Sequence, residues 1–302
     1  MEIIFYWIIK SFLFFLQCLP LRWVGFLGRC GGGAAFHLDR RHRNVTIDNL
    51  TLCFGSEKTA GEIKSIAREN FKRIGESFAS AVKTAAIPAS KIESVVKVSG
   101  VEKFYQPGLP YYPNIVFAVG HFGNFEVLGR CNIHTPEYKI ATTYRGLRQP
   151  KLNQLLLDLR TKSGAMVFER RSQASALKEV MSSQGILLGL FADQHAGDKG
   201  LHLPFFGHEC STSAAPAVFA LRYNTPLYTC FCFRTSLARW SVEVGDEIST
   251  SLDGKPRSTL DIMLDVNRSF EKAIRRDPAN WFWVHNRWKW LKQKKALELP
   301  KV

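Results

Sequence analysis

The sequence is short of acidic residues, and it lacks the motifs that would explain its charge by nucleic-acid binding. Its 302 residues include 26 aspartates and glutamates against 41 lysines and arginines, a formal net charge of +15 at pH 7. A surplus of this size suggests an anionic partner: nucleic acid, a membrane surface, or an acidic protein or substrate. The sequence contains no zinc-finger spacing, no RNP-like segment and no basic heptad region. Nucleic acid is therefore the least favoured partner.

The seven cysteines form neither a disulfide framework nor a metal-binding pattern. No Cys-x-x-Cys is present, and an odd number without regular spacing favours a reducing compartment and small buried thiols. Cys230 and Cys232 alternate on an expected strand and would share one of its faces. No usual zinc-ligand spacing is found among His195, His202, His208 and Cys210. We expect no metal and no cofactor.

The N-terminus is unusually apolar. Residues 3–19 are almost wholly aliphatic and aromatic. The length of this segment is near the lower limit for a membrane span, and Lys10 within it would cost about 2.5–3.5 kcal/mol at a bilayer centre. A cleaved signal peptide fits poorly, because Glu2 replaces the usual basic start. We expect residues 1–27 to be a membrane anchor, as a short span or an interfacial helix, with a buried core helix as the alternative. Cytoplasmic orientation and contact with anionic head groups are indicated by Arg22, Arg29, Arg40, Arg41 and Arg43.

Strand and helix patterns alternate through the rest of the chain, residues 28–302. A helix is expected over residues 59–86, and the glycines at 31–33 indicate a flexible or closely packed junction before it. Strands are expected at residues 95–99, 115–120, 140–144, 165–168, 186–192, 227–233 and 240–244. Further helices are expected at residues 125–131, 151–162, 172–182, 213–223 and 260–275. This order predicts one α/β domain with a mixed, largely parallel sheet flanked by helices, preceded by the membrane-anchoring helix.

The most informative residues follow the strand expected at 115–120. Gly120 and Gly123 predict a turn into a helix, and this turn separates His121 from Glu126. On a regular helix, side chains five positions apart point about 140° away from each other. The two can meet only if His121 lies on the turn and Glu126 on the first turn of the helix. Glu126 would then hold one imidazole nitrogen as N–H and leave the other to accept a proton, as in a general base. A surface pair or a satisfied core group is the alternative.

Three more candidates follow the ends of expected strands. Ligands of parallel sheets bind at the carboxyl ends of the strands, so Arg145 and Asp193 would share an edge with His121. Arg145 offers planar, permanently charged donors for a carbonyl or phosphate, and Arg170 is a second phosphate candidate. Asp193 would fix an arginine or His121, or only cap a turn. A surface position is the alternative for Arg145.

Six blocks of the sequence, in order, resemble the lipid A biosynthesis acyltransferases, the late lauroyl- and myristoyl-type enzymes that add secondary acyl chains to lipopolysaccharide precursors. The segment from His121 to Glu126 resembles the family's His-x4-Asp/Glu motif. Gly146 and Asn286 depart from the family's usual Pro and Arg. The blocks are residues 44–54, 121–126, 144–145, 192–194, 203–207 and 281–289.

The resemblance implies transfer of an acyl group from a thioester to a lipid hydroxyl, with His121 as base and Glu126 as its orienter. It implies an acyl carrier protein or acyl-CoA donor, a glycolipid acceptor, and a place on the cytoplasmic face of the bacterial inner membrane. Because the chain has no Gly-x-Ser-x-Gly, direct transfer is favoured over a covalent acyl-enzyme. Three alternatives remain. The protein could transfer an acyl group from acyl-CoA to another glycolipid, such as a phosphatidylinositol mannoside. It could instead be a thioester hydrolase or a non-catalytic membrane-binding protein.

Two apolar segments have open interpretations. Residues 203–207 are either core or the wall of an acyl groove, and we favour the groove slightly. The tryptophans near the C-terminus, interspersed with cations, indicate either a membrane-interface belt or a packed segment. They are Trp281, Trp283, Trp288 and Trp290, with Lys292, Lys294 and Lys295 after them.

Overall fold

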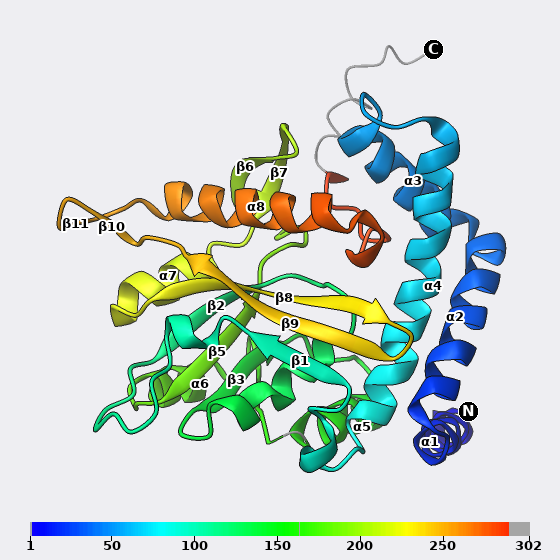
Figure 1. Cartoon of the computed structure of the whole chain (residues 1–302), viewed down its shortest axis with the longest axis horizontal. Coiled ribbons are helices and arrows are strands. Elements are labelled where there is room, and N and C mark those ends of the chain that lie inside the picture. The colour runs from blue at the N-terminus through cyan, green and yellow to red at the C-terminus, as the bar shows by residue number, and fades with distance from the viewer. Residues whose placement is uncertain (1, 163, 290–302) are drawn as a thin grey trace.

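A seven-stranded sheet with helices on both sides forms the centre of the computed structural model, which describes residues 2–162 and 164–289 (Figure 1). The strand order is β1-β9-β8-β2-β5-β3-β4. Strands β2, β3, β4, β5 and β8 run parallel, β9 is antiparallel to β8, and β1 is parallel to β9. The predicted mixed, largely parallel sheet is confirmed. Its strands are β1 (Val96–Ser99), β2 (Ile115–Val119), β3 (Lys139–Tyr144), β4 (Met166–Glu169), β5 (Ile186–Phe191), β8 (Leu227–Ser236) and β9 (Arg239–Glu247).

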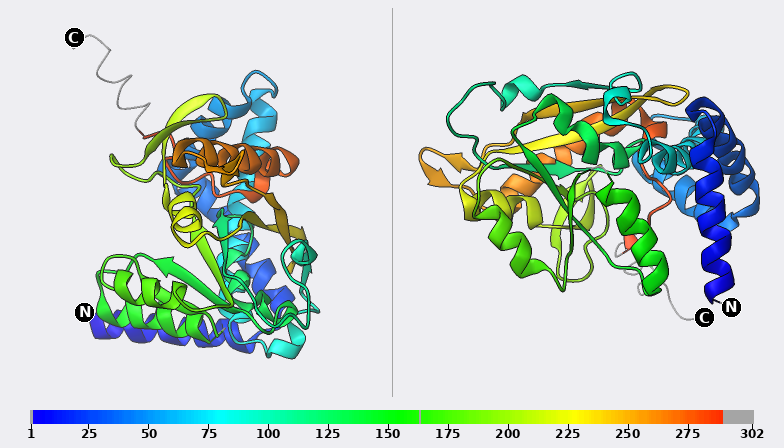
Figure 2. Two further views of the ribbon diagram at one scale, coloured as in Figure 1. Left: turned by 90° about the vertical axis from the view of Figure 1, so that its left-hand side faces the viewer. Right: turned by 90° about the horizontal axis from the view of Figure 1, so that it is seen from below.

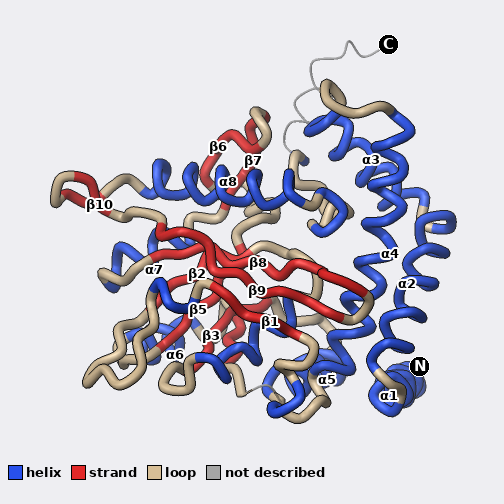
Figure 3. The backbone as a smooth tube through the Cα atoms, viewed as in Figure 1, coloured by secondary structure: helices blue, strands red, loops and turns tan. Residues whose placement is uncertain are grey.

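Both faces of the sheet are buried, which explains the continuous apolar runs of its strands. All five residues of β2 are buried: Val116 and Ala118 face one core cluster, and Phe117 and Val119 face the other. Cys230 and Cys232 share the second cluster, as predicted. The strands alternate with helices (Figure 3), namely α5 (Pro150–Thr161), α6 (Ala174–Met181), α7 (Ala215–Tyr223) and α8 (Thr259–Arg276).

Four helices precede the sheet along the chain: α1 (Glu2–Cys18), α2 (Leu21–Leu38), α3 (Arg40–Phe54) and α4 (Ala60–Thr84). Thr59 and Glu62 form a capping box that starts α4. The glycines at 31–33 lie inside α2. The interpretation of these glycines as a flexible junction is therefore wrong, and close packing is the correct one. A Cβ added at Gly32 would lie 2.1 Å from the carbonyl oxygen of Phe71, and this allows α2 to pack closely along α4.

Helix α1 lies beside α5 and the end of α4 (Figure 2). Leu16 is buried, whereas most of the aromatic side chains described on α1, Trp7, Phe12, Phe14 and Phe15, are exposed, as are Trp23 and Phe26 on α2. None of the helices in the described ranges is long and apolar enough to cross a membrane.

Several short elements depart from the expectation. Residues 125–131 fall in a 3-10 helix, η3 (Phe125–His134), instead of an α-helix, and three others are η1 (Ala89–Lys91), η2 (Val101–Lys103) and η4 (Pro278–Asn280). Two unexpected hairpins occur, one from β6 (Leu201–Phe205) and β7 (His208–Thr212), the other from β10 (Ser251–Leu252) and β11 (Lys255–Pro256).

The two apolar segments for which the sequence left two interpretations, residues 203–207 and the tryptophans from residue 281 on, both belong to the core where the structure describes them. Phe205 is 0% exposed and stacks on Trp288 with ring centroids 5.7 Å apart, and Phe206 is buried against Phe54. The favoured groove wall at residues 203–207 is therefore wrong. Trp281, Trp283 and Trp288 are also buried, because they fill the space between α3, α4 and the sheet, so they do not form a membrane belt. Trp290 and the lysines after it lie outside the described residues.

Candidate active site

The predicted site residues follow the carboxyl ends of neighbouring parallel strands. His121 comes two residues after β2, Arg145 directly after β3, Arg170 directly after β4 and Asp193 two residues after β5. The backbone N–H of Arg170 donates to the Tyr144 carbonyl at 3.1 Å, which joins the ends of β3 and β4. The parallel sheet thus brings the four residues to one edge.

Asp193 is the partner of His121. The His121 backbone N–H donates to Asp193 Oδ2 at 2.7 Å, and His121 Nδ1 lies 2.8 Å from Oδ1. A carboxylate can only accept, so Nδ1 carries the proton and Nε2 is left with a lone pair. Among the described residues no hydrogen bond to Nε2 is found. This is the arrangement of a general base, with Asp193 in the role expected of Glu126.

The Asp193 side chain is fully buried and remains ionised. Burial alone would raise the pKa of this carboxyl, but the neighbouring His121 and the donors around the carboxylate lower it below its usual value. The third donor is the indole N–H of Trp281, 2.7 Å from Oδ2. Sequence reasoning missed Trp281 because nothing in its own segment points to Asp193.

Glu126 lies elsewhere than expected. It forms a bidentate ion pair with Arg160 on α5, with Arg160 Nε 3.0 Å from Glu126 Oε2, and no hydrogen bond joins it to His121 in the described structure. Neighbouring side chains of a 3-10 helix are about 120° apart. Phe125 turns its ring toward His121 (4.9 Å between centroids), so Glu126 points away toward α5. Arg160 is a second residue that sequence reasoning missed.

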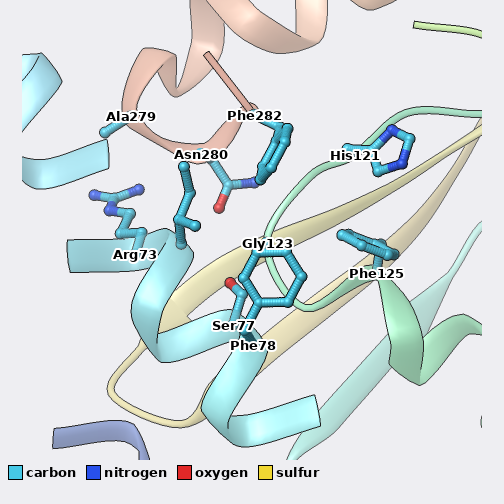
Figure 4. Close-up of a pocket in the computed structure, with 10 residues that line it drawn as sticks. Arg73, Ser77, Phe78, His121, Gly123, Phe125, Ala279, Asn280 and Phe282 are labelled. Carbon is cyan, nitrogen blue, oxygen red and sulfur yellow. The ribbon is translucent and has the colours of Figure 1, made fainter. Parts of the chain in front are cut away.

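A small groove opens at His121 (Figure 4). It has about 270 Å³ of empty space including its mouth, and its walls include Phe78 and Arg73 on α4, Phe125 and Phe282. Gly123 is required at its base, because it has φ +48° and a Cβ there would lie 2.6 Å from the Cys232 carbonyl oxygen. His121 is itself one of the residues that line this groove.

A larger apolar slot lies between the sheet and η3, near His121. It has about 530 Å³ of empty space including its opening. Its lining is apolar except for the Thr135 hydroxyl. One of its lining residues is Val119, which lies two residues before His121. Phe191 packs against the core cluster that contains Val119, and its ring lies 4.4 Å from the His121 ring. The lining residues include Phe117, Leu128, Cys131, Ile140, Leu187 and Gly189.

Arg145 and Arg170 are exposed beside the site. Glu169 accepts from the backbone N–H groups of Ser172 and Arg171 at 2.8 Å and from that of Gly146 at 3.5 Å, and the last bond joins the two loops that carry these arginines. These hydrogen bonds lower the pKa of Glu169 to about 2. Two exposed cations on a fixed loop pair could bind an anionic group at the sheet edge.

Half-buried His285 and buried Arg287 lie on the segment that follows Trp281. Burial lowers the pKa of His285 to about 4, so it is neutral near pH 7, and its Nε2 accepts from the His195 backbone N–H at 2.9 Å. Arg287 is fully buried and donates to Thr212 Oγ1 at 2.8 Å. Within the described ranges no cluster of His, Cys, Asp and Glu could hold a metal ion.

Comparison with known proteins adds the context of this site. The sequence model of the bacterial lipid A biosynthesis acyltransferases matches residues 1–290. Two curated proteins are similar to the chain: a lipid A biosynthesis palmitoleoyltransferase of Escherichia coli (strain K12) and a lipid A biosynthesis acyltransferase of Shigella flexneri. Each is 24% identical over 277 residues, which cover 90% of this chain and 86% of the relative.

Proposed function

Because the chain belongs to the bacterial lipid A biosynthesis acyltransferase family and is therefore an acyltransferase, we propose that it transfers a fatty acyl group from an acyl thioester to a hydroxyl of a lipid A precursor. Acyl carrier protein is the favoured carrier, since an acidic protein would be attracted to a surface with net charge +15. The reaction takes place at the cytoplasmic face of the inner membrane.

His121 is the general base in this proposal, and its contact with Asp193 is the observation that carries it. Nε2 takes the proton of the lipid hydroxyl while the oxygen bonds to the thioester carbonyl carbon. The carbon–sulfur bond then breaks, and the thiolate receives the proton from His121. We assign Asp193 to the orientation of His121 instead of substrate binding, because both of its oxygens already accept from His121.

Glu126 and Arg160 form the second part of the site. The pair joins η3 to α5, and Phe125, the residue before Glu126, packs its ring 4.9 Å from the His121 ring. Glu126 is therefore proposed to be a positioning residue, which holds η3 and Phe125 in place beside His121. Arg145 and Arg170 are proposed to bind phosphate groups of the acceptor.

The apolar slot is proposed to hold the acyl chain. Val119, two residues before His121, lines it, and its almost wholly apolar side chains offer burial to a fatty acid chain. This replaces residues 203–207 as the expected acyl site.

The lipid acceptor is proposed to arrive from a membrane held against α1 and the first part of α2, residues 1–27. Exposed aromatics on these helices would lie in the interface. The groove wall residue Phe78 is one helical turn from Val82, whose carbonyl accepts from Gln17 of α1 at 3.4 Å. The mouth of the groove therefore lies next to the proposed membrane surface.

Mass spectra of lipid A from cells with and without the gene test the reaction, and purified protein tests the donor, with acyl carrier protein and coenzyme A thioesters compared. His121→Ala should lower the rate by about 10²–10⁴-fold in a folded protein. Asp193→Asn should lower the rate more than Glu126→Gln, because only Asp193 contacts the base. Wild-type activity in His121→Ala would refute the mechanism, and unchanged lipid spectra would refute the acceptor.

A further inference from the structure

Residues 277–288 pass the site, and within this segment the only regular structure is η4 and a single bridge between Trp281 and Phe122. We propose that Trp281 in this segment is a positioning residue, whose indole N–H holds the Asp193 carboxylate and, through it, the ring of His121. The inference rests on the proposed role of His121 as base.

The hydrogen bonds around Asp193 define this role. Its Oδ2 accepts from the Trp281 indole at 2.7 Å and from the His121 backbone at 2.7 Å, while Oδ1 lies 2.8 Å from His121 Nδ1. Both Asp193 and Trp281 are buried, at 0% and 1% exposed, so the indole donor is shielded from solvent. An indole N–H donates and never accepts, so it cannot relay a proton. It can only hold the carboxylate.

The position of the indole is determined by elements far apart in the sequence. Asn70 on α4 donates to the carbonyl oxygens of Trp281 (2.5 Å) and Ala279 (2.9 Å). The bridge to Phe122 ties the same residue to the turn that carries His121. The ring packs on Phe205 with centroids 5.7 Å apart. The backbone of Trp281 is thus held by Asn70 and Phe122 and its ring by Phe205, while the indole N–H donates to Asp193.

Trp283 offers a matched control within the same segment. It is 0% exposed, and its indole N–H donates to the Pro278 carbonyl at 2.6 Å, away from Asp193. Substituting phenylalanine at either position removes one buried indole and its hydrogen bond. Only the change at Trp281 removes a donor from Asp193.

Steady-state kinetics of the full-length protein with an acyl thioester and a lipid A precursor test the proposal. Trp281→Phe should lower kcat by about tenfold or more with KM little changed, since a hydrogen bond to a charged group is lost. Trp283→Phe should lower the melting temperature by a similar amount and keep kcat near the wild-type value. Equal loss of kcat in both variants would overturn the proposal.

A double-mutant cycle separates positioning from a structural role. In an Asp193→Ala background, Trp281→Phe should cause no further loss of kcat, because the residue acts through Asp193. Additive losses would overturn the proposal. Wild-type kcat in Trp281→Phe, with His121→Ala inactive, would also overturn it and leave the proposed function standing. A wild-type protein without acyl transfer would instead refute the function.

If Trp281→Phe does not fold, the wild-type protein still provides a test. With tryptophan labelled by ¹⁵N, an indole proton bonded to a carboxylate should resonate downfield and move upfield in Asp193→Ala. Indole resonances that are all unchanged in Asp193→Ala would overturn the proposal.

Discussion

Gly189 is the point in the apolar slot where one substitution should change the length of acyl chain that fits. It lies on β5 between Leu187 and Phe191, on the strand face that lines the slot. A Cβ built there would lie 3.5 Å from Val119 Cγ2 and 3.9 Å from the Ala141 carbonyl oxygen, which are ordinary contacts. The strand can therefore accept valine, a favoured strand residue, and the added carbons would enter the slot.

The expected size of the effect follows from the volume that the valine occupies. Three added carbons would displace about two or three methylenes of a long acyl chain, each worth about 0.8 kcal/mol of burial. The sum is about 1.6–2.4 kcal/mol, which is about 15- to 60-fold in kcat/KM. Gly189→Val should discriminate against the longest donor by this factor, and Gly189→Ala by less.

Competition between equimolar donors of different chain length, read by mass spectrometry of the products, measures this preference. Phe206→Ala is the matched control, because Phe206 is buried in the core away from the slot and its truncation should cost about 3–5 kcal/mol of stability without changing chain-length preference. A folded Gly189→Val protein with the wild-type product distribution would refute the slot as the acyl site. A change of preference in Phe206→Ala would restore residues 203–207 as a groove.

Two further predictions concern stability and membrane contact. The pKa of Glu169 is lowered from 4.5 to about 2, so its ionised form stabilises the folded protein above pH 4.5 and this stabilisation disappears as the pH falls toward 2. The melting temperatures of wild type and Glu169→Gln should therefore converge between pH 4.5 and 2. A difference in melting temperature that stays constant over this range would contradict the prediction. Phe12→Ser with Phe15→Ser should weaken co-sedimentation with anionic vesicles by at least about 100-fold, at about 1.5–3 kcal/mol per phenylalanine. Val218→Ser, an exposed apolar position on α7, should leave it unchanged, and equal binding by all variants would refute the membrane surface.

Local patterns in the sequence were enough for the strands of the central sheet, for most helices from α4 onward and for the fold class. Short apolar runs rich in β-branched residues, such as residues 115–119, favour a doubly buried strand, and their alternation with helices favours a largely parallel sheet. The edge shared by His121, Arg145 and Asp193 followed from the same reasoning, whereas the place of Arg170 on it came from the structure. The family resemblance, carried by blocks that span the chain, is confirmed by the match over residues 1–290.

Partners within the site were decided by tertiary structure. His121 and Glu126 are close in sequence, but a 3-10 turn directs Glu126 to Arg160, while Asp193 reaches His121 because β2 and β5 are neighbours in the sheet. The role of Trp281 and the burial of Phe205 likewise depend on where a segment from the end of the chain packs. Local sequence determines backbone periodicity, but the direction of a side chain across a gap of 70 or more residues depends on how the whole chain folds.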